Sequence, residues 1–354
     1  MAKVYFKHAT LLCGLLASLA LAWGYPPAHA NPQWTELSPL AVAPPAEVKA
    51  ASAPAATAKQ PQYHHAVINP ATTVHWVVVP PAQQGWVVLP WASKQGLASV
   101  DAIAAELPAA AMVLNGGYFD PANGETASSV WTWDERLLSP DDNERLIGNE
   151  ALKPYWQAIV NRSQWQVWHC AVTQPLWRYE VGQPMIETVD APALNAQQPP
   201  TANMPSDCSL QAWLGAGPAL LPELLATQEA FVDEKAGRNP IGTTTPDARS
   251  AVAKLADGSV LLAWVQQNKP TGGMTLVQWQ QWLKSQGAEQ ALNLDGGSSV
   301  SAWLGAKVSG TPKPMLHLGK LSAKGVRVKR KVLTGLVVMP LADALKMTQV
   351  DSLY

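Results

Sequence analysis

The clearest pattern of hydrophobic and polar positions lies near the C-terminal end, where an apolar stretch stops at an acid, two glycines and two serines. Residues 291–294 are apolar except for Asn293, and Asp295 begins the polar run that follows. An apolar run bounded by turn residues is typical of a buried strand, and paired glycines permit positive φ and let a ligand approach the backbone. The pattern predicts a strand that ends in a site, with Asp295 at its C-terminal mouth.

A second stretch has the same arrangement. Apolar residues 111–114 run directly into Asn115, Gly116 and Gly117. Each diglycine on its own fits an ordinary turn, but the matched placement of the two after apolar runs favours a shared site. We therefore expect the two strand ends to lie close together in the fold.

Each apolar run follows a segment with helical spacing. Before the run at 291–294, Thr275 fits an N-cap, apolar residues recur at 276, 279 and 283, and Gly287 fits a helix end. Before the run at 111–114, apolar residues at 100, 103, 104 and 107 predict a shorter helix that Pro108 ends. The order of helix, strand and polar strand end therefore occurs twice.

Short strands are predicted elsewhere by apolar residues between turn signals. The segment 249–265 predicts a hairpin closed by Asp257 and Gly258, a pair suited to a type I′ turn. The other predicted strands span residues 65–68, 74–79, 85–89, 325–332 with a basic face, and 336–339.

The region at about 121–207 is a Trp-rich insert that also contains many Asn, Gln and Pro residues and shows few clear periods. It predicts loops and short elements that cover the sheet. A single tryptophan is most often structural, yet an indole face also stacks well on an amphipathic partner such as a sugar. The candidates for a wall of the substrate site are Trp131, Trp133, Trp156, Trp165, Trp168 and Trp177.

Residues 1–30 have the features of a secretory signal peptide: two lysines, an apolar run and a small-residue cleavage signal that ends at Ala30. An uncleaved anchor is the alternative, but the apolar run is short and interrupted by glycine. Residues 31–62 are rich in Ala and Pro and predict a linker, so that residues 63–354 form the functional domain. We expect a periplasmic or secreted protein with no transmembrane segment after signal cleavage.

The mature chain then keeps Cys170 and Cys208, an even pair in a compartment that permits disulfides. We expect one disulfide bond between them. Metal binding is the weaker alternative, because neither cysteine has a second ligand at a spacing typical of zinc sites and the adjacent His169 cannot easily bind the same ion.

The charge balance argues against nucleic acid as a partner. The chain has 25 basic and 26 acidic residues, and removal of the leader with its two lysines leaves 23 basic residues. Nucleic-acid binding relies on an excess of basic residues that this chain lacks.

Several motifs, taken in order along the chain, resemble those of the phosphodiester glycosidase family. They lie at residues 115–119, 215–218, 249–252 and 273–299. The resemblance covers about residues 63 to 339, and the last motif is the most specific. It implies an α/β (α+β) fold with a mixed β-sheet core and flanking helices. It also implies a hydrolase that cleaves a sugar-1-phosphodiester at the anomeric carbon, in cell-envelope glycan or exopolysaccharide metabolism.

Ordinary glycosidases need paired carboxylates because their leaving group must be protonated, whereas a phosphate monoester is a better leaving group. One carboxylate can suffice if an arginine and backbone N–H groups stabilise the phosphate. The predicted catalytic residues are Asp295 as base or nucleophile, Asn115 to orient it or a sugar hydroxyl, and Arg249 to bind phosphate. Asp120 and Glu125 are candidates for a second carboxylate. The predicted substrate-binding residues are Gly116, Gly117, Tyr118, Phe119, Asn293, Gly296, Gly297, Ser298 and Ser299.

We expect no cofactor, and a carbohydrate phosphodiester or cell-envelope glycan as the partner. Two other functions stay open. In a metal-dependent phosphodiesterase, Asp295, Asn115 and carbonyl oxygens would coordinate a divalent cation, although the sequence shows no dense acid cluster. The protein could instead be a non-catalytic binder of cell-envelope glycans that uses its tryptophan-rich surfaces.

Overall fold

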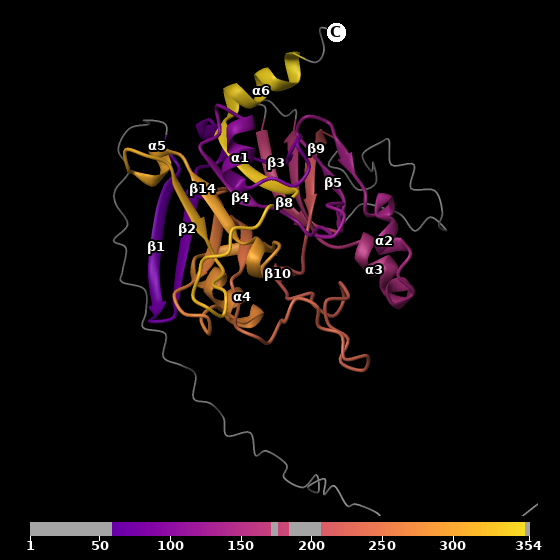
Figure 1. The fold of residues 1–354 in the computed structure, drawn as a ribbon. Coiled ribbons are helices and arrows are strands. Elements are labelled where there is room, and N and C mark those ends of the chain that lie inside the picture. The colour runs from indigo at the N-terminus through magenta and orange to yellow at the C-terminus, as the bar shows by residue number, and fades with distance from the viewer. Residues whose placement is uncertain (1–58, 171–175, 184–206, 351–354) are drawn as a thin grey trace, which may run out of the picture. The chain divides into compact units, whose positions relative to one another are not determined.

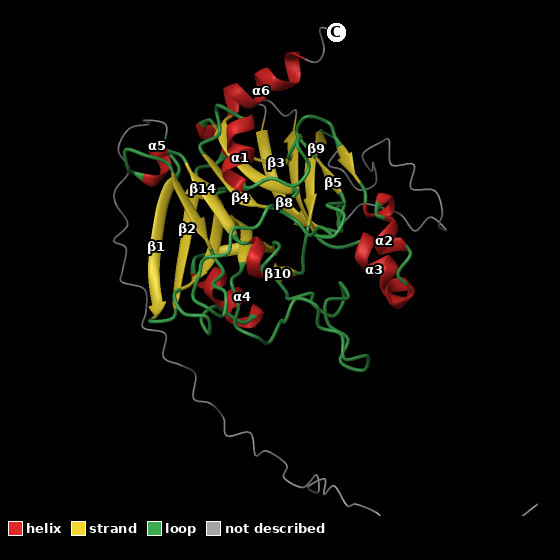
Figure 2. Ribbon diagram, in the orientation of Figure 1, coloured by secondary structure: helices red, strands yellow, loops and turns green. Residues whose placement is uncertain are grey.

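The computed structural model describes residues 59–170, 176–183 and 207–350 (Figure 1). The signal peptide expected at 1–30 and all but the last four residues of the linker expected at 31–62 lie outside these ranges. Strands dominate the described part, and helices flank them (Figure 2).

The strands form three sheets, and every strand pairing in the described residues is antiparallel. The first sheet has the order β1 (Gln62–Asn69), β2 (Thr72–Val79), β12 (Val260–Gln267), β11 (Ser250–Leu255), β13 (Ala288–Asn293) and β10 (Ala219–Leu221). The second has the order β15 (Met315–Leu318), β14 (Ser301–Leu304), β4 (Met112–Asn115), β16 (Thr334–Pro340) and β3 (Trp86–Ala92). The third has the order β6 (Leu137–Leu138), β5 (Val130–Trp131), β9 (Cys208–Gly215), β7 (Gln164–Cys170) and β8 (Leu176–Gly182).

The helices lie around these sheets. Helix α1 packs on β4 and β14, α4 packs on β13, and α6 packs on β3 and β16 (Figure 1). The α-helices are α1 (Val100–Glu106), α2 (Glu144–Ile147), α3 (Trp156–Val160), α4 (Leu276–Ser285), α5 (Ala306–Ser309) and α6 (Leu341–Val350). Short 3₁₀ segments lie at η1 (Ala82–Gln84), η2 (Pro140–Asp142), η3 (Glu150–Tyr155) and η4 (Gly297–Ser299). The α+β class predicted from the sequence is confirmed.

The elements predicted around the two diglycine motifs are present. Thr275 caps α4 in a capping box: its hydroxyl accepts a hydrogen bond from the backbone N–H of Gln278, and its own backbone N–H donates to Oε1 of the Gln278 side chain. Gly287 follows α4 with a φ of 81°, as expected for a glycine that ends a helix. Helix α1 and strands β4 and β13 also lie where the apolar spacing placed them.

The hairpin predicted at 249–265 forms from β11 and β12, but its turn is not type I′. A type I′ turn needs positive φ at two successive residues, and here Gly258 has a φ of 82° whereas Asp257 does not have positive φ. The N–H of Gly258 donates to Leu255 O, and the N–H of Leu255 donates to Ser259 O. Gly258 alone takes the left-handed conformation, which is typical of a longer hairpin loop.

The prediction of a strand at 325–332 is also wrong. The segment is irregular and pairs only through isolated bridges, Leu321 with Arg327 and Ala98 with Val332. Its alternating apolar residues are not buried on one face, since Val326 is 63% exposed. Both neighbours of β16 in the second sheet are already supplied by β3 and β4, so the segment crosses from β15 to β16 without joining the sheet.

The Trp-rich region contains more regular structure than loops and short elements. Strands β5, β6, β7 and β8 belong to it, and β9 completes the third sheet immediately after it. Trp165 and Val167 of β7 are fully buried, so this sheet shares the main core instead of only covering it.

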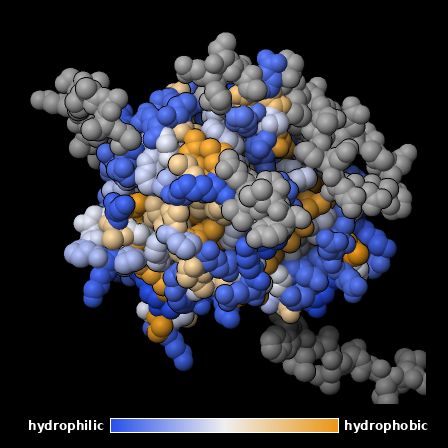
Figure 3. Space-filling model, turned by 90° about the horizontal axis from the view of Figure 1, so that it is seen from above, coloured by the Kyte–Doolittle hydropathy of each residue, from blue (hydrophilic) through white to orange (hydrophobic). Residues whose placement is uncertain are grey.

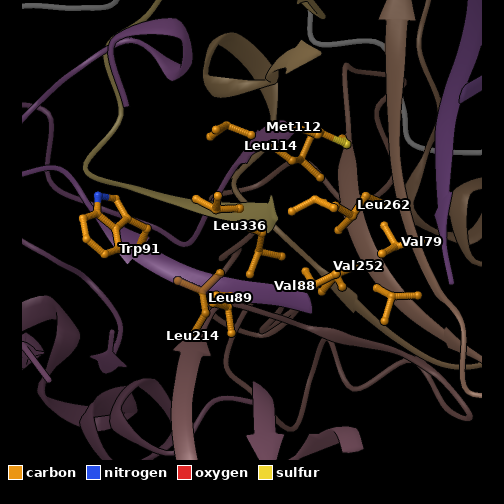
Figure 4. Close-up of a cluster of buried hydrophobic side chains, with 14 of the residues drawn as sticks. Val79, Val88, Leu89, Trp91, Met112, Leu114, Leu214, Val252, Leu262 and Leu336 are labelled. Atoms are coloured by element: carbon orange, nitrogen blue, oxygen red, sulfur yellow. The ribbon is translucent and has the colours of Figure 1, made fainter. Parts of the chain in front are cut away.

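The main core is built by all three sheets together. Figure 4 shows Val88 and Leu89 of β3 packed among residues of the other sheets. Val252 and Leu262 come from the first sheet, and Leu214 comes from the third. Because a single apolar cluster joins the sheets, their ends are held in fixed positions relative to one another.

The expected disulfide bond is present between Cys170 and Cys208. The two cysteines are register partners on adjacent strands, Cys170 at the end of β7 and Cys208 at the start of β9. The bond therefore fastens the outer end of the third sheet.

The surface of the described residues carries few large hydrophobic side chains. Seen from above, hydrophilic residues surround small hydrophobic patches (Figure 3). The exposed large hydrophobic residues are Val67, Ile68, Ile147, Val277, Leu316, Val326 and Leu345, which lie on several different elements. None of the helices in the described ranges has the length and apolar character needed to cross a membrane.

A buried aromatic cluster lies where β1, β2, β12 and β15 meet. The hydroxyl of Tyr63 lies 2.7 Å from Nδ1 of His75, and the His75 ring stacks on Trp264 at 5.5 Å between centroids. The ring of His317 is 4.7 Å from that of His75. Among the described residues, the Nε2 atoms of both histidines are buried without a hydrogen-bond partner. Burial lowers the pKa of His75 to about 3 and that of His317 to about 4.

The cluster predicts a loss of stability on acidification. Nearby charge from His65 and Arg327 lowers these two pKa values further. In the unfolded chain these two histidines bind protons below about pH 6.5, whereas in the folded chain they stay neutral until the pH nears 3 to 4. The free energy of unfolding should therefore be highest above about pH 6.5 and fall as the pH drops from there towards 3 to 4. We expect a loss of about 2 kcal/mol per histidine at pH 5. Chemical denaturation of wild type and His317→Phe at pH 8 and pH 5 tests this, and an equal pH dependence in both would contradict it.

Candidate functional site

Two strand ends from different sheets meet at the candidate site. Strand β4 ends at Asn115, and β13 ends two residues before Asp295. The Asn115 side chain donates from Nδ2 to the carbonyl oxygen of Asp295 (2.7 Å), and the N–H of Asp295 donates to the carbonyl oxygen of Gly116 (3.0 Å). Ser250 donates from Oγ to the same Asp295 carbonyl (3.0 Å). The strand ends expected to lie together are therefore in direct contact.

Asn115 is part of this support and does not line the cavity. Its side chain is fully buried, and its Oδ1 accepts a hydrogen bond from the N–H of Ser301 (3.2 Å). With Nδ2 on the Asp295 carbonyl, the amide links three segments of chain. A group held in this way orients the backbone at Asp295 and cannot reach a substrate.

The first diglycine serves close backbone packing. A Cβ on Gly116 would lie 2.4 Å from Oγ1 of Thr334, and one on Gly117 would lie 2.3 Å from the carbonyl oxygen of Gly215. Neither glycine has positive φ. These two positions therefore need glycine because other chain segments approach them, a reason that does not depend on a ligand.

An open cavity of about 800 Å³ lies beside Asp295. The predicted site residues that line it are Tyr118, Phe119, Arg249, Asp295, Gly296, Gly297 and Ser298. The predicted residues that do not line it are Asn115, Gly116, Gly117, Asn293 and Ser299. Arg249 and Asp295, the predicted guanidinium and carboxyl, do share one cavity.

Asp295 is the carboxyl with the most unusual environment in the cavity. Burial raises its pKa to about 6, and this desolvation outweighs three interactions that favour the ionised form. These are a hydrogen bond from the Ser299 side chain, the charge of Arg330, and the backbone N–H of Gly296. A carboxyl with a pKa near neutrality can both accept and donate a proton at physiological pH.

Tyr118 forms a fixed wall of the cavity. Its hydroxyl donates to the carbonyl oxygen of Gly217 (2.8 Å) and accepts from Nδ2 of Asn293 (3.0 Å). Burial and the nearby charge of Asp295 raise its pKa, so the hydroxyl stays protonated. Asn293 thus acts on the site through Tyr118 and does not itself reach the cavity.

Arg249 is buried and bonded mainly to backbone. Its Nε donates to Met274 O (3.1 Å) and its Nη1 donates to Ile241 O (2.9 Å). Its Nη2 donates to Gly242 O (2.7 Å) and to Thr245 O (2.9 Å). Desolvation lowers its pKa. Four of the five N–H groups of the guanidinium therefore hold the chain segments that form one wall of the cavity.

The expected cradle of backbone N–H groups is absent from these motifs. The N–H of Gly116 donates to Thr334 O, and that of Gly117 donates to Thr334 Oγ1. The N–H of Gly296 serves the carboxylate of Asp295, and that of Gly297 donates to Ala248 O. Each of these four N–H groups is committed within the protein, which leaves the arginine side chains of the cavity as candidate donors for an anion.

The structure adds Arg162, Phe231, Arg238 and Asp247 to the cavity wall. None of the tryptophans in the described residues lines this cavity, so the predicted tryptophan wall gains no support from it. Asp247 was accessible to sequence reasoning, since it lies two positions before Arg249. Arg162 and Arg238 stand in loops without a recognisable motif, and only the fold brings them to the cavity.

Asp247 is the second carboxylate of the cavity. Its Oδ1 lies 2.5 Å from Nζ of Lys320 and accepts the N–H of Ala248 (2.6 Å). The two acids held in reserve lie elsewhere: Asp120 pairs with Arg145 (2.9 Å), Glu125 accepts from Asn123, and neither lines the cavity.

The irregular basic segment after β15 also reaches the site. Arg330 donates from Nη1 to Oγ of Ser298 (2.7 Å), and its guanidinium lies 5.8 Å from the centre of the Phe119 ring. Its charge favours the ionised form of Asp295. The sequence predicted a strand with a basic face at 325–332. One of its basic residues, Arg330, instead fixes the loop of the cavity that contains Ser298.

The described residues contain no group of three or more His, Cys, Asp or Glu side chains arranged to hold a metal ion. Asp295 and Asp247 are the two carboxylates that line the cavity. Asp247 forms an ion pair with Lys320. Few carboxylate oxygens in the described part of the cavity are therefore available as ligands for a cation.

Comparison with known families gives one match. Residues 109–339 of this chain match the phosphodiester glycosidase family model. This range includes both strand ends and every residue named in the cavity. No curated protein matches the chain.

Solved structures with a similar fold have low sequence identity. The zebrafish N-acetylglucosamine-1-phosphodiester alpha-N-acetylglucosaminidase catalytic domain, auto-inhibited by its pro-peptide, is 19% identical, with a TM-score of 0.49 over 76% of this chain and 77% of that one. A hypothetical protein from Synechocystis is 18% identical, with a TM-score of 0.46 over 79% and 62%. A protein from Burkholderia pseudomallei described as exported is 14% identical, with a TM-score of 0.49 over 76% and 74%.

The hydrogen bond from Ser299 gives a direct test of the Asp295 environment. Ser299→Ala removes a donor that stabilises the carboxylate, so the pKa of Asp295 should rise further above its present value of about 6. Titration of the Asp295 carboxyl by ¹³C NMR measures the shift. Ser285→Ala on the exposed end of α4 is the control, and a lower pKa in Ser299→Ala would contradict the assignment.

Proposed function

This chain belongs to the phosphodiester glycosidase family, and from that premise we propose that it hydrolyses a sugar-1-phosphodiester at the anomeric carbon. Water adds to the anomeric carbon, the bond from that carbon to the phosphate ester oxygen breaks, and the products are a free sugar and a phosphate monoester. The single observation that carries the proposal is Asp295, a carboxyl with a pKa of about 6 in a cavity whose other charged residues are mainly arginines.

The charge of the cavity suits an anionic substrate. Arg162, Arg238 and Arg249 line it against Asp247 and Asp295, and Asp247 is paired with Lys320. A buried positive field attracts a phosphodiester and stabilises the charge that develops on the leaving phosphate. The leaving phosphate then needs little help from a general acid, so one titrating carboxyl is enough.

We assign the catalytic step to Asp295 and supporting roles to its neighbours. Asp295 acts at the anomeric centre as a base that activates water or as a nucleophile. Asn115 and Ser250 hold its backbone carbonyl, and Ser299 sets the orientation and proton affinity of its carboxylate. Tyr118 and Phe119 form the wall against which the sugar packs.

The disulfide bond bears on the compartment in which the protein acts. A disulfide bond such as Cys170–Cys208 persists in oxidising compartments. Together with the signal peptide expected at 1–30, it supports a periplasmic or secreted enzyme that acts on cell-envelope glycans or exopolysaccharides.

The metal-dependent phosphodiesterase makes a different prediction about chelators. If Asp295 acts without a bound cation, prolonged treatment with EDTA followed by dialysis should leave the rate of phosphodiester hydrolysis within about twofold of the untreated protein. Added Mg²⁺, Ca²⁺ or Mn²⁺ should not raise that rate. A loss of activity that one cation restores would favour the metal-dependent alternative.

Removal of the carboxylate gives the sharpest test of the catalytic assignment. Asp295→Asn keeps the side-chain shape, so the fold should persist while kcat for a sugar-1-phosphodiester falls by about 10²- to 10⁴-fold. Circular dichroism and a thermal melt check the fold. Asn69→Asp, at the exposed end of β1, serves as a control. Near-normal turnover in Asp295→Asn would remove Asp295 from the mechanism.

The pH profile distinguishes the proton role of Asp295. As a base or nucleophile it must be ionised, so kcat/KM of the wild type should fall as pH drops below about 6. Ser299→Ala should move that limb to higher pH. A fall above pH 6 would instead make Asp295 a general acid.

Complete inactivity on a panel of sugar-1-phosphodiesters, with retained binding to envelope glycans, would favour the non-catalytic binder.

A further inference from the structure

We propose that Arg162 is the residue that binds the substrate phosphate, and that Arg249 builds the cavity wall. The inference rests on the proposed function for the identity of the phosphate as part of a sugar-1-phosphodiester. It reverses the assignment that the sequence suggests, in which the arginine of the 249–252 motif is the phosphate ligand. The argument compares the hydrogen-bond donors that the two buried guanidinium groups have left for a ligand.

Arg249 has little donor capacity to spare. Its Nε, one N–H of Nη1 and both N–H groups of Nη2 are matched by four backbone carbonyl oxygens. A guanidinium carries five N–H groups, so one remains. A bidentate grip on a phosphate needs two parallel N–H groups, and Arg249 can offer them only by releasing the backbone it holds.

Arg162 has the opposite arrangement. Its Nε donates to the carbonyl oxygen of Glu229 (3.2 Å), and neither Nη atom has a hydrogen-bond partner among the described residues. Neither Nη atom is among the buried polar atoms that lack a partner, so both reach solvent, and Arg162 lines the cavity. In the described part of the chain, four N–H groups of a side chain that is only 7% exposed are therefore without a protein partner, and this side chain forms part of the cavity wall.

Packing holds this guanidinium in a fixed plane. It lies 3.9 Å from the centre of the Phe231 ring and 6.0 Å from that of Tyr118. With Nε fixed on Glu229, the plane of the fork has little freedom to rotate. An arginine held this way loses little conformational entropy when it binds a phosphate, which is the geometry that favours arginine over lysine.

The charge of Arg162 is available as well as its donors. No carboxylate lies within ion-pair distance of it in the described part of the chain. Burial lowers its pKa, but only to about 10, so it stays charged at neutral pH. The nearest compensating group is Glu229, whose own pKa burial raises, which weakens it as a counter-ion. A phosphate in the cavity would supply the missing counter-charge.

The position of Arg162 also fits the catalytic group. Arg162, Tyr118 and Asp295 line the same cavity, and the guanidinium of Arg162 lies 6.0 Å from the centre of the Tyr118 ring. A phosphate on Arg162 would therefore occupy the cavity that contains Asp295. Arg238 is half-exposed, stacks on Tyr155 at 4.7 Å, and stands nearer the rim.

Direct anion binding tests the inference without turnover. Inorganic phosphate is titrated by calorimetry into the full-length protein and into Arg162→Gln, Arg162→Lys and Arg178→Gln, the last being an exposed arginine on β8. We expect Arg162→Gln to weaken phosphate binding at least tenfold. The phosphate affinity of Arg162→Lys should lie between those of the wild type and Arg162→Gln, because lysine keeps the positive charge but lacks the paired N–H groups of the guanidinium. Arg178→Gln should match the wild type. Circular dichroism confirms that each variant is folded.

Kinetics separate this inference from the proposed function. With a sugar-1-phosphodiester, Arg162→Gln should raise KM at least tenfold with a smaller change in kcat, and Arg162→Lys should raise it less; for an aryl glycoside of the same sugar, the change should be less than threefold. Arg249→Lys should mainly lower the melting temperature. Phosphate binding unchanged in folded Arg162→Gln or Arg162→Lys, or absent in the wild type, would overturn the inference. A wild type that binds phosphate through Arg162 but cleaves no phosphodiester would overturn the proposed function alone.

Discussion

The site depends on the hydrogen bonds that join the end of β4 to the chain after β13. The Asn115 side chain and the Gly116 carbonyl oxygen bind the backbone of Asp295 from the second sheet, and Ser250 binds it from the first. A buried amide that lost these partners would be left unsatisfied, at a cost of about 1–3 kcal/mol. The Asp295 carboxyl is therefore placed by rigid backbone, and the core shared by three sheets keeps the two strand ends from moving apart.

Two features of the cavity have the same physical origin, which is burial. Desolvation raises the pKa of Asp295 and lowers those of Arg162 and Arg249, and in each case it is the largest contribution. The protein compensates the buried cations with carbonyl oxygens and aromatic faces instead of carboxylates. Such compensation stabilises the guanidinium without cancelling its charge, so a positive field remains for an anion.

Local sequence predicted those parts of the fold that local forces decide. The caps of α4, the strand ends at Asn115 and Asp295, the β11–β12 hairpin and the Cys170–Cys208 bond follow from propensity, spacing and compartment. The glycines were recognised as necessary, but their reason was not, because the close approach of Thr334 and Gly215 is a long-range contact. The third sheet was missed because its strands are rich in Gln and Trp, and because pairing with β9 decides their structure.

The same limit explains the difference between the two arginines. A motif shows that Arg249 is required at its position, and four backbone carbonyls supply a sufficient reason that is independent of substrate. Arg162 belongs to no motif, since its relation to the cavity is set by Phe231 and Glu229, some 70 positions later in the chain. In this chain the motif around Arg249 marks a place where backbone is held, whereas free donor capacity indicates where a ligand can be bound. In this cavity the two criteria select different residues, and the second follows only from the count of hydrogen bonds in the folded chain.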